Sequence, residues 1–262
     1  MIRITYVTIT FNAAKVLQRT LDSVLQQDYP NIVHLIIDGA STDDTMKLVE
    51  DYIARSNAAE NGHRIQVTSE PDKGIYDAMN KGLRSLDGDY VCYLNAGDFL
   101  PSADTVSRIA EAISQQPSSN TQLPAVLYGD TDIVDGEGRF LHHRRLSPPE
   151  HLTWKSFKQG MLVCHQAFYA RTDFAIATPY DMQYRYSADV DWCIRVMKAA
   201  EKENIPLLNL KMVVANYTEE GQTTLHHRES LCERYKVMEH HYGRIQTCLL
   251  HVWFVIRALL KH

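Results

Sequence analysis

The chain has 262 residues, of which 45% are hydrophobic and 23% are charged. This length and composition are ordinary for one large globular domain, or for a domain with a small appendage, and they exclude a collagen-like, disordered or polytopic membrane protein. The formal net charge is −5, from 32 acidic and 27 basic side chains, which argues against a broad nucleic-acid-binding surface.

The first hundred residues alternate between apolar, often β-branched runs and segments in which apolar side chains recur at helical spacing. We predict strands over residues 4–10, 32–37, 65–68 and 90–94. We predict helices between them, over residues 16–25, 45–56 and 76–86. Strands that are apolar almost throughout and alternate with helices are typical of a parallel α/β sheet buried on both faces.

Polar side chains follow the ends of these four strands. Ligands bind beyond the carboxyl ends of the strands in such sheets, so these positions predict one shared site. The residues concerned are Asn12, Asp38, Glu70, Asp72 and Asp98.

The pattern after Pro101 is weaker. We expect residues 131–160 to be irregular, with a hairpin near residues 135–138. The other expected elements are a helix over 103–115, a polar loop over 116–124, a strand over 125–128, a helix over 188–200, a strand within 206–214 and a helical tail from residue 228. Residues 245–256 of this tail carry no Asp, Glu, Lys or Arg, but they are too few to span a bilayer, which needs about 20 apolar residues.

Four segments within residues 4–98 carry polar residues in a specific order and spacing. They read VTITFNA at 7–13, IIDGASTDDT at 36–45, EPDKGIYDAMNKG at 70–82 and YVCYLNAGD at 90–98. Together they resemble the family-2 type of inverting, nucleotide-sugar-dependent glycosyltransferases. The resemblance implies a GT-A-type, Rossmann-like fold with a mostly parallel central sheet flanked by helices. It implies a catalytic domain over residues 1–225, with a nucleotide-sugar half over 1–100 and an acceptor half over 101–225, and a helical C-terminal tail over 226–262.

A nucleotide-diphosphate sugar needs a slot for its base, an anchor for its ribose and charge to offset its diphosphate. An acid such as Asp38 can accept hydrogen bonds from the base or ribose, and Lys73 can face the diphosphate, while Gly74 permits close backbone approach. The alternative role for Asp38 is a cap on the turn after its strand. The resemblance implies these donor-binding residues: Thr10, Asn12, Asp38, Asp72, Lys73 and Asn95.

The NAGD segment at residues 95–98 stands where the family places its metal-binding acids. The usual motif has two acids that flank one residue; here the first acid is replaced and Gly97 precedes Asp98. Mg²⁺ and Mn²⁺ prefer carboxylate, phosphate and water oxygens. The resemblance therefore implies one of these divalent metals as a cofactor, with Asp98 as its ligand. The alternative is a simple turn formed by these four residues.

The segment YSADVDWCIR at residues 186–195 resembles the acidic motif that supplies the family's catalytic base. Ala188 replaces the first acid, so Asp189 is the best match for the base and Asp191 is the second choice. The start of a helix favours an ionised carboxylate, as a base requires. The alternative is helix capping, with Trp192 in the core.

Two dipeptides resemble acceptor-side steps of the family: GD at residues 129–130 and HQ at residues 165–166. A lone histidine in an apolar run is also common as a satisfied core residue. The acidic motif adds its aromatic residue to these dipeptides. The resemblance therefore implies these acceptor-side residues: Asp130, His165, Gln166 and Trp192.

The C-terminal part suggests two further hypotheses. One is that residues 221–224 form a mobile loop over the donor, with His226 or His227 at the diphosphate. The other is that the apolar stretch within residues 245–260, with basic residues at its ends, attaches the chain to a membrane surface or a partner. The alternative for this stretch is packing on its own catalytic domain.

The sequence thus predicts a metal-dependent, inverting glycosyltransferase of the hexosyltransferase type. Its donor is a nucleotide sugar, with UDP-sugars the commonest in the resembling family, and its acceptor is a saccharide or a lipid-linked molecule. The resemblance implies cell-surface polysaccharide biosynthesis. The widely spaced cysteines lack a CxxC pair and the first residues do not resemble a signal peptide, so we expect a cytoplasmic protein, acting peripherally at the inner face of the membrane.

Other protein classes fit less well. A dinucleotide-dependent oxidoreductase needs a glycine-rich turn after the first strand, and a zinc hydrolase needs an HExxH-like spacing; the sequence has neither. A noncatalytic nucleotide-sugar-binding or glycan-binding scaffold of the same fold stays the alternative, because the first acids of two motifs are missing.

Overall fold

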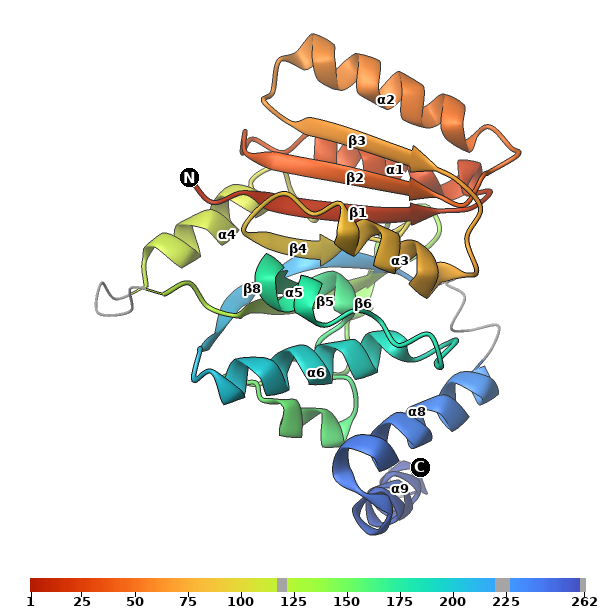
Figure 1. Cartoon of the computed structure of the whole chain (residues 1–262), viewed down its shortest axis with the longest axis vertical. Coiled ribbons are helices and arrows are strands. Elements are labelled where there is room, and N and C mark those ends of the chain that lie inside the picture. The colour runs from red at the N-terminus through yellow and green to blue at the C-terminus, as the bar shows by residue number, and fades with distance from the viewer. Residues whose placement is uncertain (117–121, 220–226, 260–262) are drawn as a thin grey trace.

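The computed structural model describes residues 1–116, 122–219 and 227–259. Its strands form one sheet with parallel and antiparallel pairs, and helices flank this sheet (Figure 1). The strands are β1 Ile4–Thr10, β2 Ile32–Asp38, β3 Arg64–Ser69, β4 Tyr90–Tyr93, β5 Val126–Val134, β6 Phe140–His143, β7 Phe168–Arg171 and β8 Leu207–Thr218. The helices are α1 Ala14–Leu25, α2 Thr45–Ala59, α3 Ile75–Arg84, α4 Thr105–Ser114, α5 Thr172–Ala177, α6 Ala188–Lys202, α8 His227–Tyr242 and α9 Arg244–Leu259. The 3-10 helices are η1 Trp154–Gln159 and η2 His165–Ala167.

The strand order in the sheet is β3-β2-β1-β4-β7-β5-β6, and β8 pairs with β5. β1 pairs in parallel with β2 and β4, and β2 pairs in parallel with β3. β7 is antiparallel to both β4 and β5, so it joins the first four strands to the rest of the sheet. The carboxyl ends of β1 to β4 therefore lie at one edge. The predicted mostly parallel sheet flanked by helices is confirmed.

Alternate side chains of β2 face different helix layers. Ile36 is buried with Leu17 of α1, in a cluster that also includes residues of α2. Ile37 faces α3, where Gly82 allows a close approach: a Cβ at Gly82 would lie 2.8 Å from the Val7 side chain and 3.7 Å from that of Ile37. Because both faces of the inner strands are covered, their sequences are apolar almost throughout.

The structure differs from the prediction mainly after residue 125. Residues 131–134 and 140–143 are not irregular as expected; they belong to the antiparallel pair β5–β6, which surrounds the predicted hairpin. β7 and α5 are not predicted by the sequence pattern. A strand of four residues that passes directly into a helix of six is too short to show either periodicity.

The two C-terminal helices follow β8 in the chain, and α8 contacts α6 (Figure 1). Gly243 ends α8 with a φ of +83°, a left-handed conformation that glycine adopts without strain. One face of α9 is exposed: Ile245, Leu249, Val252 and Trp253 are each more than half exposed. None of the described helices is both long and apolar enough to cross a membrane.

Candidate functional site

A cleft lies at the carboxyl edge of the first strands. Its walls come from the segments that follow β1 and β4, the loop before α3, η2, the start of α6 and the end of β8. Most of the predicted site residues line it: Asn12, Asp72, Lys73, Asn95, Asp98, His165, Gln166 and Asp189. The fold therefore brings the predicted donor, metal and catalytic motifs into one cleft.

A chain of hydrogen bonds connects Asp189 with the segment after β4. Asp189 Oδ2 lies 3.2 Å from His165 Nδ1, and His165 Nε2 lies 2.9 Å from Asn95 Nδ2. With the Asn95 amide donating to Nε2, His165 carries its proton on Nδ1 and donates it to the carboxylate. The second oxygen of Asp189 accepts a hydrogen bond from the Tyr76 hydroxyl at 3.2 Å. Asp189 is thus oriented from two sides.

The surroundings of Asp189 favour its ionised form. Burial by itself would raise the pKa of this carboxyl, but the hydrogen bond from His165, with the positive charge of Arg234, holds the pKa of Asp189 below its usual value. Burial and the neighbouring Asp189 raise the pKa of Tyr76, which therefore stays a hydrogen-bond donor. Asp189 still exposes 17% of its side chain, so this carboxylate is accessible to a small group.

Asp98 is almost buried, and its two oxygens have different partners. Gln166 Nε2 donates to Oδ2 at 2.7 Å, and the backbone N–H of Thr218 donates to Oδ1 at 3.0 Å. Burial raises the pKa of Asp98 to about 6, against the lowering effect of these hydrogen bonds and of His165. The two residues of the HQ dipeptide therefore each contact one of the predicted acids.

The oxygen atoms in the turn before Asp98 suit a hard divalent cation. Asn95 Oδ1 is buried and has no hydrogen-bond partner within the described parts of the chain. A carboxylate and an amide oxygen are ligand types that Mg²⁺ and Mn²⁺ accept. Residues 1–116, 122–219 and 227–259 contain no group of three or more His, Cys, Asp and Glu side chains that could hold a metal. The described residues therefore supply only part of a coordination shell.

The loops after β1 and β2 are connected through Asn12. This residue has a φ of +48°, and its side-chain oxygen accepts a hydrogen bond from the backbone N–H of Thr42 at 2.9 Å. Its own backbone N–H donates to Ser41 Oγ at 2.8 Å. Asn12 therefore holds the two loops in one shape at the edge of the cleft.

Asp38 and Thr10 lie behind these loops and do not line the cleft. The carboxylate of Asp38 is fully buried and accepts hydrogen bonds from the Thr10 and Ser69 hydroxyls and from both the N–H and the hydroxyl of Ser41. Burial raises the pKa of Asp38, but these hydrogen bonds outweigh it and hold the pKa below its usual value. This is the turn-capping geometry; a contact between Asp38 and a nucleoside stays a prediction.

The approach of Asp72 to the end of β2 depends on Gly39. A Cβ at this glycine would lie 2.6 Å from Asp72 Oδ2 and 3.3 Å from the Phe11 ring. Asp72 Oδ1 also accepts the N–H of Gly74 at 2.8 Å, which shapes the turn that carries Lys73. This end of the cleft presents an exposed aromatic ring, a carboxylate and an exposed lysine.

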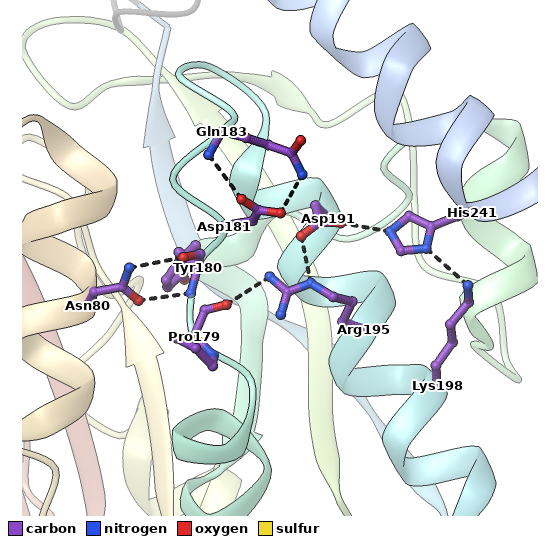
Figure 2. Close-up of polar contacts among 9 residues, drawn as sticks. All are labelled: Asn80, Pro179, Tyr180, Asp181, Gln183, Asp191, Arg195, Lys198 and His241. Atoms are coloured by element: carbon purple, nitrogen blue, oxygen red, sulfur yellow. Dashed lines mark hydrogen bonds and ion pairs between the residues drawn. The ribbon is translucent and has the colours of Figure 1, made fainter.

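Asp191, the second choice for the base, lies outside the cleft. It is buried between Arg195 Nε at 2.6 Å and His241 Nε2 at 2.7 Å, as Figure 2 shows. Two residues along a helix correspond to a rotation of about 200°, so Asp189 and Asp191 point in different directions. The structure therefore gives Asp191 no access to an acceptor hydroxyl.

Two acceptor-side predictions also fall outside the cleft. Trp192 is fully buried, and its ring stacks on that of Tyr180 with centroids 4.9 Å apart. Asp130 lies on β5 and does not line the cleft. Both residues can affect the site only through the packing of the elements that carry them.

Some hypotheses concern residues that the structure does not describe. The donor loop over residues 221–224 and His226 lie outside the described residues. The same is true of the basic residues that follow the apolar stretch: Lys261 lies outside the described residues, and so does the side chain of Arg257. The side chain of His227 is also not described.

The structure adds residues that the sequence analysis missed. Tyr76 belongs to the EPDKGIYDAMNKG segment and lies at the start of a helix. These two features could have predicted it as a site residue. Thr218 contributes through its backbone N–H, which no sequence pattern reports. The cleft is further lined by residues from the loop before α6 and from α8: Met182, Tyr184, Arg185, Tyr186 and Ser230.

Sequence comparisons find related proteins over most of the chain. The family model described as glycosyl transferase family 2 matches residues 5–176. The PGL/p-HBAD biosynthesis glycosyltransferase of Mycobacterium bovis (strain BCG / Pasteur 1173P2) is 34% identical over 215 residues, which cover 81% of this chain and 75% of that protein. An uncharacterized glycosyltransferase of Mycobacterium tuberculosis (strain CDC 1551 / Oshkosh) is 32% identical over 206 residues, covering 77% of this chain and 71% of that protein.

Solved structures share the fold. S. aureus TarS 1-349 in complex with UDP-GlcNAc matches with a TM-score of 0.69 at 17% identity, covering 90% of this chain and 64% of that chain. The mannosyltransferase PcManGT from Pyrobaculum calidifontis, in complex with GDP-Man and Mn²⁺, matches with a TM-score of 0.61 at 16% identity, covering 95% of this chain and 68% of that chain. At such identities these structures show the fold alone, and the predicted GT-A-type fold is confirmed.

Proposed function

The chain belongs to glycosyl transferase family 2, and on that premise we propose that it transfers a sugar from a nucleotide-diphosphate donor to a hydroxyl of a saccharide or lipid-linked acceptor. The observation that carries the proposal is the accessible carboxylate of Asp189, which His165 and Tyr76 hold in the same cleft as Asp98 and the proposed donor loops. A UDP-sugar is the proposed donor, in cell-surface polysaccharide biosynthesis. TarS bound to UDP-GlcNAc supports this choice of nucleotide.

Asp189 acts as the general base. It takes the proton of the acceptor hydroxyl while the hydroxyl oxygen attacks the anomeric carbon of the donor sugar. His165 and Tyr76 hold both carboxylate oxygens, so the base needs little reorganisation as the proton moves. One displacement, without a covalent intermediate, inverts the anomeric configuration.

The donor residues surround the other end of the cleft. Lys73 offsets the diphosphate charge, and Asn12 and Asp72 shape the nucleoside end. Asn95, whose Oδ1 has no hydrogen-bond partner among the described residues, is the remaining donor-binding residue of the cleft. Asp98 would hold Mg²⁺ or Mn²⁺, oriented by Gln166. When bound, such an ion stabilises the negative charge on the leaving diphosphate.

We also propose that α9 contacts the surface of the inner membrane, where a lipid-linked acceptor would lie. Ile245, Leu249, Val252 and Trp253 are exposed at helical spacing, which makes one apolar stripe. Arg244, at the start of the helix, has 82% of its side chain exposed and can approach anionic head groups.

The function is tested with a panel of nucleotide sugars. We expect one donor to raise the melting temperature of the purified chain more in the presence of Mn²⁺ than in its absence. We expect the same donor to be turned over, measured as release of the nucleoside diphosphate with and without saccharide acceptors. Stabilisation by a nucleotide sugar without any turnover across the acceptors would contradict the enzyme and favour the scaffold.

A further inference from the structure

We propose that Glu233, on the C-terminal helix α8, is a positioning residue of the transfer reaction and that it holds the acceptor-side wall of the cleft. The wall is the loop over residues 179–187, which leads into α6. This inference rests on the proposed function only for its kinetic consequences. Its structural part concerns contacts between α8 and the loop.

The carboxylate of Glu233 accepts hydrogen bonds from three successive backbone N–H groups. Oε1 accepts from Arg185 at 2.8 Å, and Oε2 accepts from Tyr186 at 2.6 Å and from Ser187 at 3.1 Å. A second contact joins the same elements, since Ser187 Oγ donates to the backbone carbonyl of Ser230 at 3.2 Å. Hydrogen bonds to an ionised carboxylate are stronger than neutral ones, so Glu233 strongly restricts the end of this loop.

The start of the loop is held by other elements, as Figure 2 shows. The amide of Asn80, on α3, bonds both backbone groups of Tyr180: its nitrogen donates to the carbonyl at 3.0 Å and its oxygen accepts from the N–H at 2.8 Å. Arg195, on α6, donates to the carbonyl of Pro179 at 2.8 Å. The loop is therefore anchored by α3 and α6 at its start and by α8 at its end.

The residues between these anchors face the acceptor side. Met182, Tyr184, Arg185 and Tyr186 line the cleft, and so does Ser230 of α8. Asp189 follows Ser187, the last residue that Glu233 holds, by two positions, so a shift of the loop end also moves the base. The hydrogen bonds of Glu233 within the described residues go to the end of this loop, so we expect loss of its carboxylate to affect the acceptor side first.

Amide hydrogen exchange tests the contact without any need for activity. In Glu233→Ala we expect the amides of Arg185, Tyr186 and Ser187 to exchange at least about tenfold faster, because they lose their acceptor. The amides of β1 serve as the internal control and should keep their protection. Unchanged exchange at residues 185–187 would overturn the proposal.

Kinetics test the consequence. Misplacement of a reacting group by about 1 Å can cost about 100-fold, so we expect Glu233→Ala to lower kcat with acceptor about 10- to 100-fold while the Kd of the nucleotide sugar stays unchanged. Glu233→Gln keeps one acceptor oxygen and should recover part of the loss. Glu229→Ala, which changes an exposed glutamate on the same helix, should match the wild type.

The outcomes separate this inference from the function on which it rests. If Glu233→Ala and Glu233→Gln both keep wild-type kcat, or if donor affinity falls as much as kcat, Glu233 is a structural residue and the proposal is wrong. If the wild-type chain turns over no nucleotide sugar, the proposed function fails, and the exchange data alone decide whether Glu233 holds the loop.

Discussion

His165 and Gln166 are adjacent in the sequence but hold different acids of the cleft. His165 contacts Asp189, whereas Gln166 donates to Asp98. Their backbone belongs to the short 3-10 helix η2, in which successive side chains point about 120° apart. A single dipeptide therefore sets the relative placement of the proposed base and the proposed metal ligand.

Replacement of the base gives the first prediction. Asp189→Asn removes the proton acceptor with little change in volume, so we expect kcat to fall by a factor of roughly 10²–10⁴. The Kd of the nucleotide sugar, measured by calorimetry, should barely change. Asp191→Asn is the comparison, and it should keep the kcat of the folded protein. Near-normal turnover in Asp189→Asn, together with loss of turnover in Asp191→Asn, would show that Asp191 and not Asp189 is the base.

The second prediction concerns the pH dependence of the reaction. Since His165 lowers the pKa of Asp189 against the effect of burial, His165→Gln should raise that pKa. A base must be deprotonated, so the acid limb of the profile of kcat/KM against pH should move to higher pH. His142→Gln, at an exposed histidine on β6, should leave the limb in place. An unmoved limb in His165→Gln would exclude this role of His165.

At the scale of elements, the sequence predicts what is local and periodic. β1 to β4 and the helices between them have strong patterns, and the structure contains all of them. The order of these strands also places Asn12, Asp72 and Asp98 at one edge, as predicted. The sequence does not predict which residues hold Asp98 and the loop before α6. Thr218 acts through its backbone, and Glu233 approaches the loop from a helix 46 residues or more further along the chain.

Helix α6 contributes to two different regions of the molecule. Asp189 faces the cleft, whereas Asp191 faces α8. His241 donates from Nε2 to Asp191 and accepts at Nδ1 from Lys198 at 3.0 Å, which requires a neutral imidazole (Figure 2). Arg195 is the second partner of Asp191. This buried cluster joins the C-terminal helix to the helix that carries the proposed base.

The third prediction is therefore about stability. His241→Ala leaves the buried Asp191 carboxylate with one hydrogen-bond donor fewer, so the free energy of unfolding should fall by about 1–3 kcal/mol in urea titrations. His240→Ala, at the exposed neighbour, should cost much less. Equal losses in the two variants would show that the cluster does not stabilise the protein.

The same cluster has a pH signature. Burial and the charge of Lys198 hold the pKa of His241 below its usual value, although Asp191 raises it. The unfolded chain then binds a proton at a pH where folded His241 does not, so this stability is complete above about pH 6.5 and is lost as the pH falls below it. Urea titrations between pH 8 and pH 5 should show a steeper decline in the wild type than in His241→Ala.

At the scale of the whole molecule, the apolar stripe of α9 gives the fourth prediction. In flotation with vesicles that contain anionic lipid, the full chain should be recovered in the vesicle fraction. The double variant Leu249→Glu, Trp253→Glu places charge on the stripe and should abolish this recovery. The control variant Lys236→Gln, at an exposed residue of α8, should have little effect. Equal flotation of the double variant and the wild type would exclude α9 as the contact.

β7 has a consequence for how such a protein can diversify. The strand pairs with β4 through only Tyr90 and Val91, and within the described residues this is the ladder that joins the first four strands to the rest of the sheet. The proposed donor loops, which follow β1 and β2, lie on one side of that short seam, and the loop before α6 lies on the other. On the proposed assignment of the two sides, genetic exchange at this seam would combine one donor-binding part with different acceptor-binding parts, because only one short ladder has to be preserved.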